Sequence, residues 1–275
     1  MSHDATQLMR CLYVDLDGTL LGPDASLLRD GEGRFELLGV RALEACFRAE
    51  VEVVIYSGRR QAQVAEDARL IGMRSYVFEA GAGLVLDGEL EWLTGGIVPG
   101  ERGSIFEQIE ASGAPALLLE HYAGRLDYHA PWHLNREVSH LFRGEVDAVE
   151  ADALLREHGH EQLRLVDNGS LHGMHAPERG YHLVPAASSK VAAVARHMQA
   201  RGFGPIDCVA VGDSREDLGA ADVVGAFWFV GNAVPRDPTL RGAVGGRANV
   251  RFAEAGYGAG VYEAVMTTLA QRRGV

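Results

Sequence analysis

CLYVDLDGT, residues 11–19, is an apolar run that ends in two acids, Asp15 and Asp17, and a glycine, Gly18. Side chains two positions apart on a strand point to the same side, so these two carboxylates converge. Ligands of open α/β sheets collect at the carboxyl ends of the strands. Because converging carboxylates repel each other, the pair implies a cation, a proton or both. The alternative, a plain turn at Asp17 and Gly18, leaves three further elements of the sequence unexplained.

Around this stretch, apolar runs bounded by turn residues alternate with helical patterns. The patterns predict strands at 11–16, 51–56, 207–211 and 226–230, and helices at 40–49, 61–71, 190–199, 217–221 and 261–272. Strands that alternate with helices form parallel sheets. The sequence therefore predicts an α/β fold with a parallel-sheet core.

Residues 84–185 follow a different pattern, in which candidate strands meet across two-residue turns. These turns are expected at 87–88, at 168–169 and, more weakly, at 123–124. Helical patterns at 104–111 and 145–158 lie between them. We expect an antiparallel α+β module in this part of the chain.

A second strand, predicted at 51–56, ends in Ser57 and Gly58 at the start of a helix. A serine there can donate to a phosphate oxygen, with backbone N–H groups and the helix dipole assisting. Taken alone, Ser57 is better explained as a helix N-cap. The phosphate-binding interpretation therefore depends on the other elements.

Lys190 is the single lysine among 26 lysine and arginine residues, and it opens a predicted helix. An ammonium is a compact charge that can contact a phosphate and a carboxylate together, whereas a guanidinium is a wide planar fork. Its position indicates a site that arginine does not fit. The alternative is that this lysine is present by chance in a sequence that otherwise uses arginine.

The last element follows the apolar run 208–211, where Asp213 and Asp217 stand in the sequence GDSRED. Asp213, Asp15 and the backbone carbonyl of Asp17 offer the hard oxygen ligands that suit Mg²⁺. An acidic helix N-terminus explains Asp217 adequately but not the whole set.

Together these residues resemble the haloacid dehalogenase superfamily of phosphohydrolases, with DLDGT, Ser57, Lys190 and GDSREDLGAAD as its four motifs in order. The resemblance implies a Rossmann-like core at 1–83 and 186–275 with an inserted α+β cap at 84–185. The interval from Ser57 to Lys190 has room for this cap, which resembles the type IIB cap.

The resemblance also implies roles for individual residues. Asp15 is the nucleophile that forms an aspartyl-phosphate, and Asp17 is the general acid and base. Mg²⁺ is bound at Asp15, Asp17 and Asp213, with Asp217 supporting that site. The amide of Leu16 binds the transferring phosphoryl group with Ser57, Gly58 and Lys190. An acid at position 17 argues against carbon–halogen cleavage, because dehalogenases of this superfamily lack it.

Two positions depart from the family pattern. Ala80 stands where the type IIB branch usually carries asparagine, and Glu216 replaces the usual asparagine beside Asp217. A carboxylate cannot donate to phosphate as an amide can, so Glu216 is not expected to bind it.

The predicted cap holds nine of the eleven histidines, His121 to His182, and also Arg125, Arg136, Arg143 and Arg164. This composition suits a polar substrate that carries a second negative charge. Type IIB relatives are Cof-like, sucrose-phosphate and mannosyl-3-phosphoglycerate phosphatases, so we expect hydrolysis of a sugar phosphate or glycosyl phosphoglycerate. A phosphomutase of the phosphomannomutase type and a non-catalytic sugar-phosphate sensor are the alternatives.

Charge and cysteine usage limit the partners of the chain. The formal net charge is −12, which argues against binding to nucleic acid or to anionic lipid. No window approaches the length of a membrane span. Cys11, Cys46 and Cys208 lie far apart in apolar stretches and are expected to be buried thiols. We therefore expect a cytoplasmic enzyme with a small phosphorylated substrate.

Overall fold

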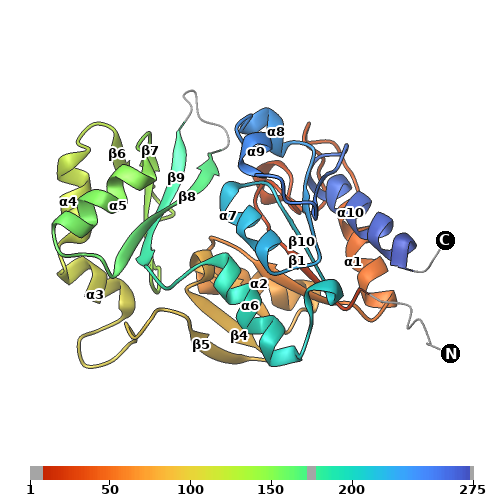
Figure 1. Ribbon diagram of the computed structural model, residues 1–275, viewed down its shortest axis with the longest axis horizontal. Helices are drawn as coiled ribbons and strands as arrows, with labels where there is room; N and C mark the ends of the chain where they lie inside the picture. Colours follow the sequence, from red (N-terminus) through yellow and green to blue (C-terminus); the bar gives the residue numbers. More distant parts are fainter. Residues whose placement is uncertain (1–8, 172–177, 273–275) are drawn as a thin grey trace. The chain divides into compact units, whose positions relative to one another are not determined.

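The computed structural model describes residues 9–171 and 178–272, which form two compact units (Figure 1). One unit comprises Met1–Tyr56 with Val194–Val275, and the other comprises Ser57–Ala193. The predicted bounds of core and cap, at 83/84 and 185/186, stay a prediction.

In the described part of the first unit, five parallel strands pair in the order β12-β11-β10-β1-β2. Their bounds are β1 (Cys11–Val14), β2 (Glu52–Tyr56), β10 (Cys208–Gly212), β11 (Ala226–Phe229) and β12 (Val250–Phe252). The central strands β1 and β10 are buried along their whole length. Such continuous apolar strands are typical of parallel sheets covered on both faces. The α/β fold class with a parallel-sheet core is confirmed.

Helices of the first unit include α1 (Leu38–Arg48), α10 (Tyr257–Arg272) and the short α7 (Arg215–Leu218), α8 (Ala233–Arg236) and α9 (Leu240–Ala243). The buried positions of α1, Gly39, Ala42, Leu43 and Cys46, recur at the spacing of one helix face. A Cβ on Gly39 would lie 3.2 Å from the Cα of Gly258. These two glycines let α1 and α10 pack closely.

The second unit contains the antiparallel strands β3 (Tyr76–Phe78), β4 (Gly83–Leu86) and β5 (Glu89–Trp92), with helix α2 (Gln61–Ile71). Helix α6 (Lys190–Arg201) begins in this unit, and its part from Val194 onward belongs to the first unit. Asp87 and Gly88 join β4 to β5 with φ values of 52° and 94°. Two positive φ values are what a tight hairpin turn of this kind requires. The hairpin predicted at 87–88 is confirmed.

A separate four-stranded antiparallel sheet in this unit has the order β6-β7-β9-β8. Its strands are β6 (Leu126–Tyr128), β7 (His140–Gly144), β8 (Leu163–Ser170) and β9 (Arg179–Pro185), with α3 (Ile105–Ala111), α4 (Ala114–His121) and α5 (Ala148–Glu157) packed against it (Figure 1). Ile109, Leu118 and Leu155 of these helices share one buried core with Phe142 and Leu183 of the sheet. Each such side chain contributes roughly 2 kcal/mol by leaving water.

Two predicted hairpins are wrong. The apolar run before 123–124 is helix α4, which begins after Gly113 and has a proline in its first turn; a short apolar run does not distinguish strand from helix. At 168–169 the chain continues along β8, and the ladder shifts register between Asp167 and Ser170. Gly169, with φ 91°, therefore serves a β-bulge instead of a turn.

No helix among the described residues combines the length and the apolar character that crossing a membrane demands.

Candidate functional site

Asp15 and Asp213 each follow a buried strand of the parallel sheet, β1 and β10. The N–H of Asp15 donates to the carbonyl of Val211 at 3.1 Å, which fixes the end of β1 beside β10. The side chain of Asp15 is buried, with 5% of the residue exposed. The carboxyl ends of these strands therefore place both acids at one edge of the sheet, as predicted.

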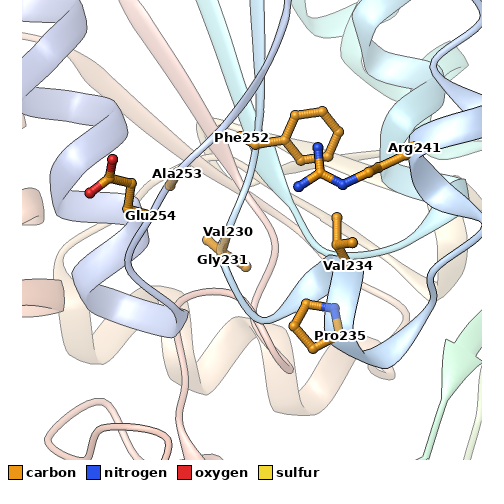
Figure 2. Close-up of a pocket in the computed structure, with 8 residues that line it drawn as sticks. All are labelled: Val230, Gly231, Val234, Pro235, Arg241, Phe252, Ala253 and Glu254. Carbon is orange, nitrogen blue, oxygen red and sulfur yellow. The ribbon is translucent and has the colours of Figure 1, made fainter.

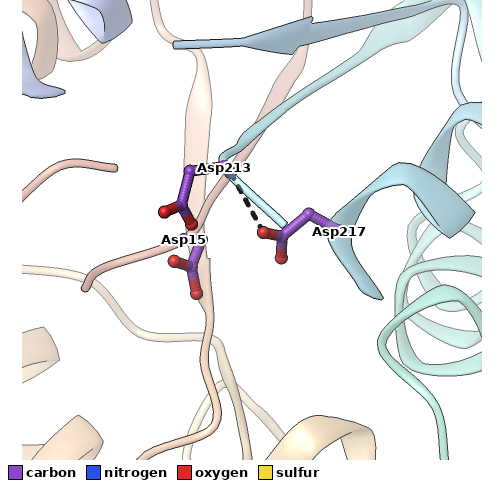
Figure 3. Close-up of side chains that lie close together, drawn as sticks. All are labelled: Asp15, Asp213 and Asp217. Carbon is purple, nitrogen blue, oxygen red and sulfur yellow. Dashed lines mark hydrogen bonds between the residues drawn. The ribbon is translucent and has the colours of Figure 1, made fainter. Parts of the chain in front are cut away.

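Three carboxylates meet at this edge (Figure 3). Asp15, Asp213 and Asp217 each offer an oxygen, and these atoms lie within 4.8 Å of one another. Burial, together with the charges of these acids, raises the pKa of the nearby Tyr56 well above its ordinary value. A cluster of hard, negatively charged oxygens suits Mg²⁺, so the donor set fits the predicted cofactor.

Asp217 differs from the other two acids because its Oδ2 already accepts several hydrogen bonds. The N–H of Asp213, at 3.1 Å, and the N–H and hydroxyl of Ser214, at 3.0 and 2.7 Å, all donate to it. A Cβ on Gly212 would overlap its carboxylate. Asp217 thus holds the loop that carries Asp213, and its predicted supporting role at the metal stays a prediction.

Asp17 lies in the turn that follows β1, and its residue is exposed. The turn is closed by the N–H groups of Thr19 and Leu21, which donate to the carbonyl of Leu16 at 3.2 and 2.9 Å. The acidic cluster found in the described residues does not include the Asp17 carboxylate. Its predicted contribution to a metal is a backbone carbonyl, so the predicted role of Asp17 stays a prediction.

Arg236 is a partner of the acidic cluster that sequence reasoning missed. Its Nη1 donates to Oδ2 of Asp213, while the hydroxyl of Thr19 donates to Oδ1 at 3.4 Å. A methyl group on Gly18 would overlap both members of this ion pair, and φ at Gly18 is 84°. Gly18 is therefore required for two reasons, the left-handed backbone and the close approach of the pair.

Asn232 connects the turn after β1 to the start of α10. Its amide Nδ2 donates to the carbonyl of Gly18 at 2.8 Å, and its Oδ1 accepts from the N–H of Tyr257 at 2.7 Å. Asn232 lies between β11 and α8, in the sequence VGNA at 230–233. Its contacts now give Asn232 a structural role.

Ser57 and Gly58 lie in the second unit, in a turn that leads into α2. The N–H of Ala80 donates to the carbonyl of Ser57 at 3.2 Å, and the N–H of Glu79 donates to that of Arg59 at 2.9 Å. Helix α2 has Arg60 at its N-cap. The alternative of Ser57 as the N-cap is therefore wrong, and its Oγ accepts from the N–H of Arg59 at 3.2 Å.

The segment 79–81 also lies against the start of α6, where Lys190 stands. All three of its residues have positive φ, and a Cβ on Gly81 would overlap the backbone of Ser189 and Lys190. Lys190 is 1% exposed. One strained segment thus positions both Ser57 and Lys190, and such strain is frequent at functional sites.

The predicted cap arginines have protein partners. Arg125, Arg136 and Arg164 donate to the backbone carbonyls of Glu145, Gly58 and Ser188, and Arg143 lies 3.9 Å from the carboxylate of Glu178. These guanidinium groups therefore interact with carbonyl and carboxylate oxygens of the chain itself. His172 and His175 lie outside the described residues.

His182 is the histidine of this group that lies beside the predicted phosphate-binding turn. A Cβ on Gly58 would be 2.9 Å from its Nε2 and 3.1 Å from the amide of Asn168. Burial, followed by the positive charges of Arg136 and Lys190, holds the pKa of His182 well below its ordinary range. A neutral imidazole therefore packs against Gly58.

A separate pocket of about 410 Å³ lies in the first unit beyond the ends of β11 and β12 (Figure 2). Val234 and Phe252 form part of its wall, and the guanidinium of Arg241 lies 4.9 Å above the ring of Phe252. Its lining includes none of the predicted site residues. We assign it no role.

The chain is similar to several phosphatases, one in sequence and others in structure. No family model matches the chain. The chain is 25% identical over 268 residues to a phosphoglycolate phosphatase from Methanoculleus marisnigri, with 94% of this chain and 96% of that protein covered. Its structure is similar to that of the sucrose-phosphatase from Synechocystis sp. PCC6803 in complex with sucrose and phosphate, with TM-score 0.63, 16% identity and coverage of 95% and 98%.

A third similar protein is the sugar phosphatase BT4131 of HAD subclass IIB, with TM-score 0.60, 16% identity and coverage of 96% of this chain and 99% of that one. These relatives agree with the fold, the resemblance and the enzyme class predicted from the sequence.

Proposed function

We propose that this chain belongs to the haloacid dehalogenase superfamily and is a Mg²⁺-dependent phosphomonoester hydrolase that acts on a sugar phosphate. The observation that carries the proposal is the meeting of Asp15, Asp213 and Asp217 at the carboxyl ends of β1 and β10. The class of its relatives supports the reaction, and the similar sugar phosphatases support the substrate.

In the proposed reaction, a carboxylate oxygen of Asp15 attacks phosphorus and the ester P–O bond breaks. Asp17 donates a proton to the departing alkoxide. Asp17 then takes a proton from water, whose oxygen attacks the aspartyl-phosphate and releases inorganic phosphate. Asp15 is buried, so few water molecules compete with a phosphate ester for its carboxylate.

Asp15, Asp213 and the backbone carbonyl of Asp17 would hold Mg²⁺. The ion would offset negative charge as an anionic nucleophile meets an anionic phosphate. Asp217 keeps the Asp213 loop in place through its hydrogen bonds to the loop backbone. In the second unit, Ser57, Gly58 and Lys190 are proposed to bind phosphate with the amide of Leu16.

The proposal is tested by release of inorganic phosphate from a panel of phosphate esters, with Mg²⁺ and with a chelator. The panel holds hexose phosphates, a glycosyl phosphoglycerate, phosphoglycolate, nucleotides and a phosphopeptide. We expect Mg²⁺-dependent release with sugar phosphates preferred. Preference for phosphoglycolate would instead assign the substrate of the curated relative, and absence of release from every ester would overturn the phosphatase assignment.

The two alternatives predict other products. A phosphomutase returns the phosphoryl group to a sugar, so isomerised sugar phosphate accumulates in place of inorganic phosphate. A non-catalytic sensor binds sugar phosphate without any turnover. The relatives favour hydrolysis, because those compared above are phosphatases.

We also propose a cytoplasmic location. Cys11, Cys46 and Cys208 are free and buried, which supports a reducing compartment.

Replacing Lys190 by arginine is expected to lower kcat/KM about 10- to 100-fold. Lys190 is 1% exposed, and its backbone contacts the segment at Gly81, so the wider guanidinium has little room for the same contact. Steady-state kinetics measure the effect, and the melting temperature serves as the control for folding. Wild-type kinetics in a folded variant would make the solitary lysine an accident of composition.

Replacing Arg236 by glutamine is expected to tighten Mg²⁺ binding about tenfold. The guanidinium pairs with Oδ2 of Asp213, and a positive charge there opposes the approach of a dication. Calorimetric titration with Mg²⁺ measures the dissociation constant. Arg247→Gln is the matched control, because Arg247 pairs with Asp222 instead. Unchanged or weaker binding by the Arg236 variant contradicts the prediction.

A further inference from the structure

A buried ion pair adjoins the turn that carries Ser57. Nε of Arg136 lies 3.8 Å from Oε2 of Glu79, with the two side chains 2% and 0% exposed. A buried pair of charges is costly unless further hydrogen bonds satisfy it. The hydrogen bonds of Glu79 and of Arg136 therefore indicate which part of the backbone this ion pair holds in place.

Glu79 is held in place by donors from the segment just after Arg136. Its Oε1 accepts from the N–H of Glu137 at 2.8 Å. Its Oε2 accepts from the N–H of Val138 at 3.2 Å and from the N–H and hydroxyl of Ser139 at 2.5 and 2.7 Å. The carboxylate thus fixes both the charge and the backbone beside Arg136.

The guanidinium of Arg136 extends from this anchor to the Ser57 turn. Its Nε donates to the hydroxyl oxygen of Ser139 at 3.0 Å, and its Nη2 donates to the carbonyl of Gly58 at 2.6 Å. A planar fork with fixed donor directions is well suited to hold one carbonyl in one orientation.

The orientation of the Gly58 carbonyl determines what Ser57 does. A peptide unit is planar and trans, so its N–H points opposite to its carbonyl. With the Gly58 carbonyl turned to Arg136, the N–H of Arg59 points the other way and donates to Oγ of Ser57 at 3.2 Å. Because Oγ accepts this bond, the hydroxyl proton of Ser57 is kept for donation to another group.

We propose that Arg136 is a positioning residue that orients Ser57 as a hydrogen-bond donor to the phosphoryl group. The inference rests on the proposed function in one respect, that Ser57 binds phosphate. Gly58 lacks a side chain, so without Arg136 its peptide unit is freer to rotate. Rotation turns a carbonyl oxygen toward Ser57, whose proton is then taken up by the protein.

The test is a double-mutant cycle on binding of inorganic phosphate, measured by calorimetry in the presence of Mg²⁺. Ser57→Ala and Arg136→Lys are each expected to weaken binding about tenfold. The double variant is expected to be no weaker than either single one, because both changes remove the same hydrogen bond. Lysine keeps the charge beside Glu79 but cannot span both Glu79 and Gly58.

Arg136→Gln is the second variant, and Arg69→Gln is the matched control, since Arg69 of the same unit forms an exposed pair with Glu66 instead. The melting temperature of each variant is measured as well. We expect the control to bind phosphate as the wild type does, and Arg136→Gln to match Arg136→Lys in phosphate affinity even where it melts earlier.

Additive losses in the double variant, or unchanged phosphate affinity in folded Arg136→Lys, would overturn the inference. The cycle measures binding alone, so it stands apart from turnover. Phosphate binding with a coupled cycle but no ester hydrolysis would refute the proposed function and keep the inference. Ester hydrolysis with additive losses in the double variant would support the proposed function and refute the inference. A wild-type protein that does not bind phosphate overturns the inference too.

Discussion

Asp15→Asn is expected to reduce phosphate release by roughly 10⁴-fold or more while leaving the melting temperature within a few degrees of the wild type. Asparagine has almost the same shape, and the backbone bond from Asp15 to Val211 is unaffected. What is lost is the anionic nucleophile, for which an amide is no substitute. The same change removes one of the repelling charges in the acidic cluster, which limits any cost to stability.

Release of phosphate from the preferred ester measures this effect, with purified variants compared at saturating Mg²⁺. Asp222→Asn is the matched control, since it removes a carboxylate that pairs with Arg247 in the same unit. The control is expected to keep wild-type turnover. Turnover by Asp15→Asn close to that of the wild type would refute the assignment of Asp15 as the nucleophile.

The parallel core was predictable because its signals are local and repeated. The bounds of α2 agree with the predicted helix at both ends, and α6 begins at Lys190 as expected. Acids at strand ends could be placed in advance because parallel strands bring their carboxyl ends to one edge. Asp15 and Asp213 therefore meet although they are far apart in the chain.

Local sequence patterns gave wrong predictions where the same residues are compatible with two different local structures. Asn168-Gly169 favours positive φ, and both a hairpin turn and a β-bulge use it. Only the pairing of β8 with β9 decides between them, since the ladder resumes at Ser170 opposite Arg179. Likewise, the short run of leucines in α4 is compatible with either a strand or a helix.

The residues that orient the site were not predictable, because a charge in a sequence does not name its partner. Arg136 is one of four cap arginines that suit a negatively charged substrate by composition alone, and in the structure its guanidinium contacts Glu79 and the Gly58 carbonyl. Arg236 carried no motif at all, and its pairing with Asp213 depends on a close approach that Gly18 permits. Long-range packing decides such contacts.

Glu79→Gln is expected to destabilise the protein by about 3 to 5 kcal/mol. The substitution keeps the volume but leaves Arg136 buried without its charge partner and presents an NH₂ group to backbone donors. Burial raises the pKa of Glu79, but Arg136, followed by hydrogen bonds from Glu137 and Ser139, outweighs burial and holds it below the ordinary value. Denaturant unfolding near pH 6 measures the loss.

The sign of the pH dependence separates this account from a simple packing defect. A carboxyl group whose pKa is lowered by folding adds stability that is present above its unfolded pKa, about 4.3, and that is lost as the pH falls through the folded value. The gap between wild type and Glu79→Gln should therefore be full near pH 6, below the pKa of about 7 to which burial and Glu79 raise Glu137, and shrink on further acidification. Glu66→Gln is the control, because Glu66 forms an exposed pair with Arg69 and is expected to change stability by no more than about 1 kcal/mol. A gap of the same size at every pH would show that the charge of Glu79 is not what stabilises this segment.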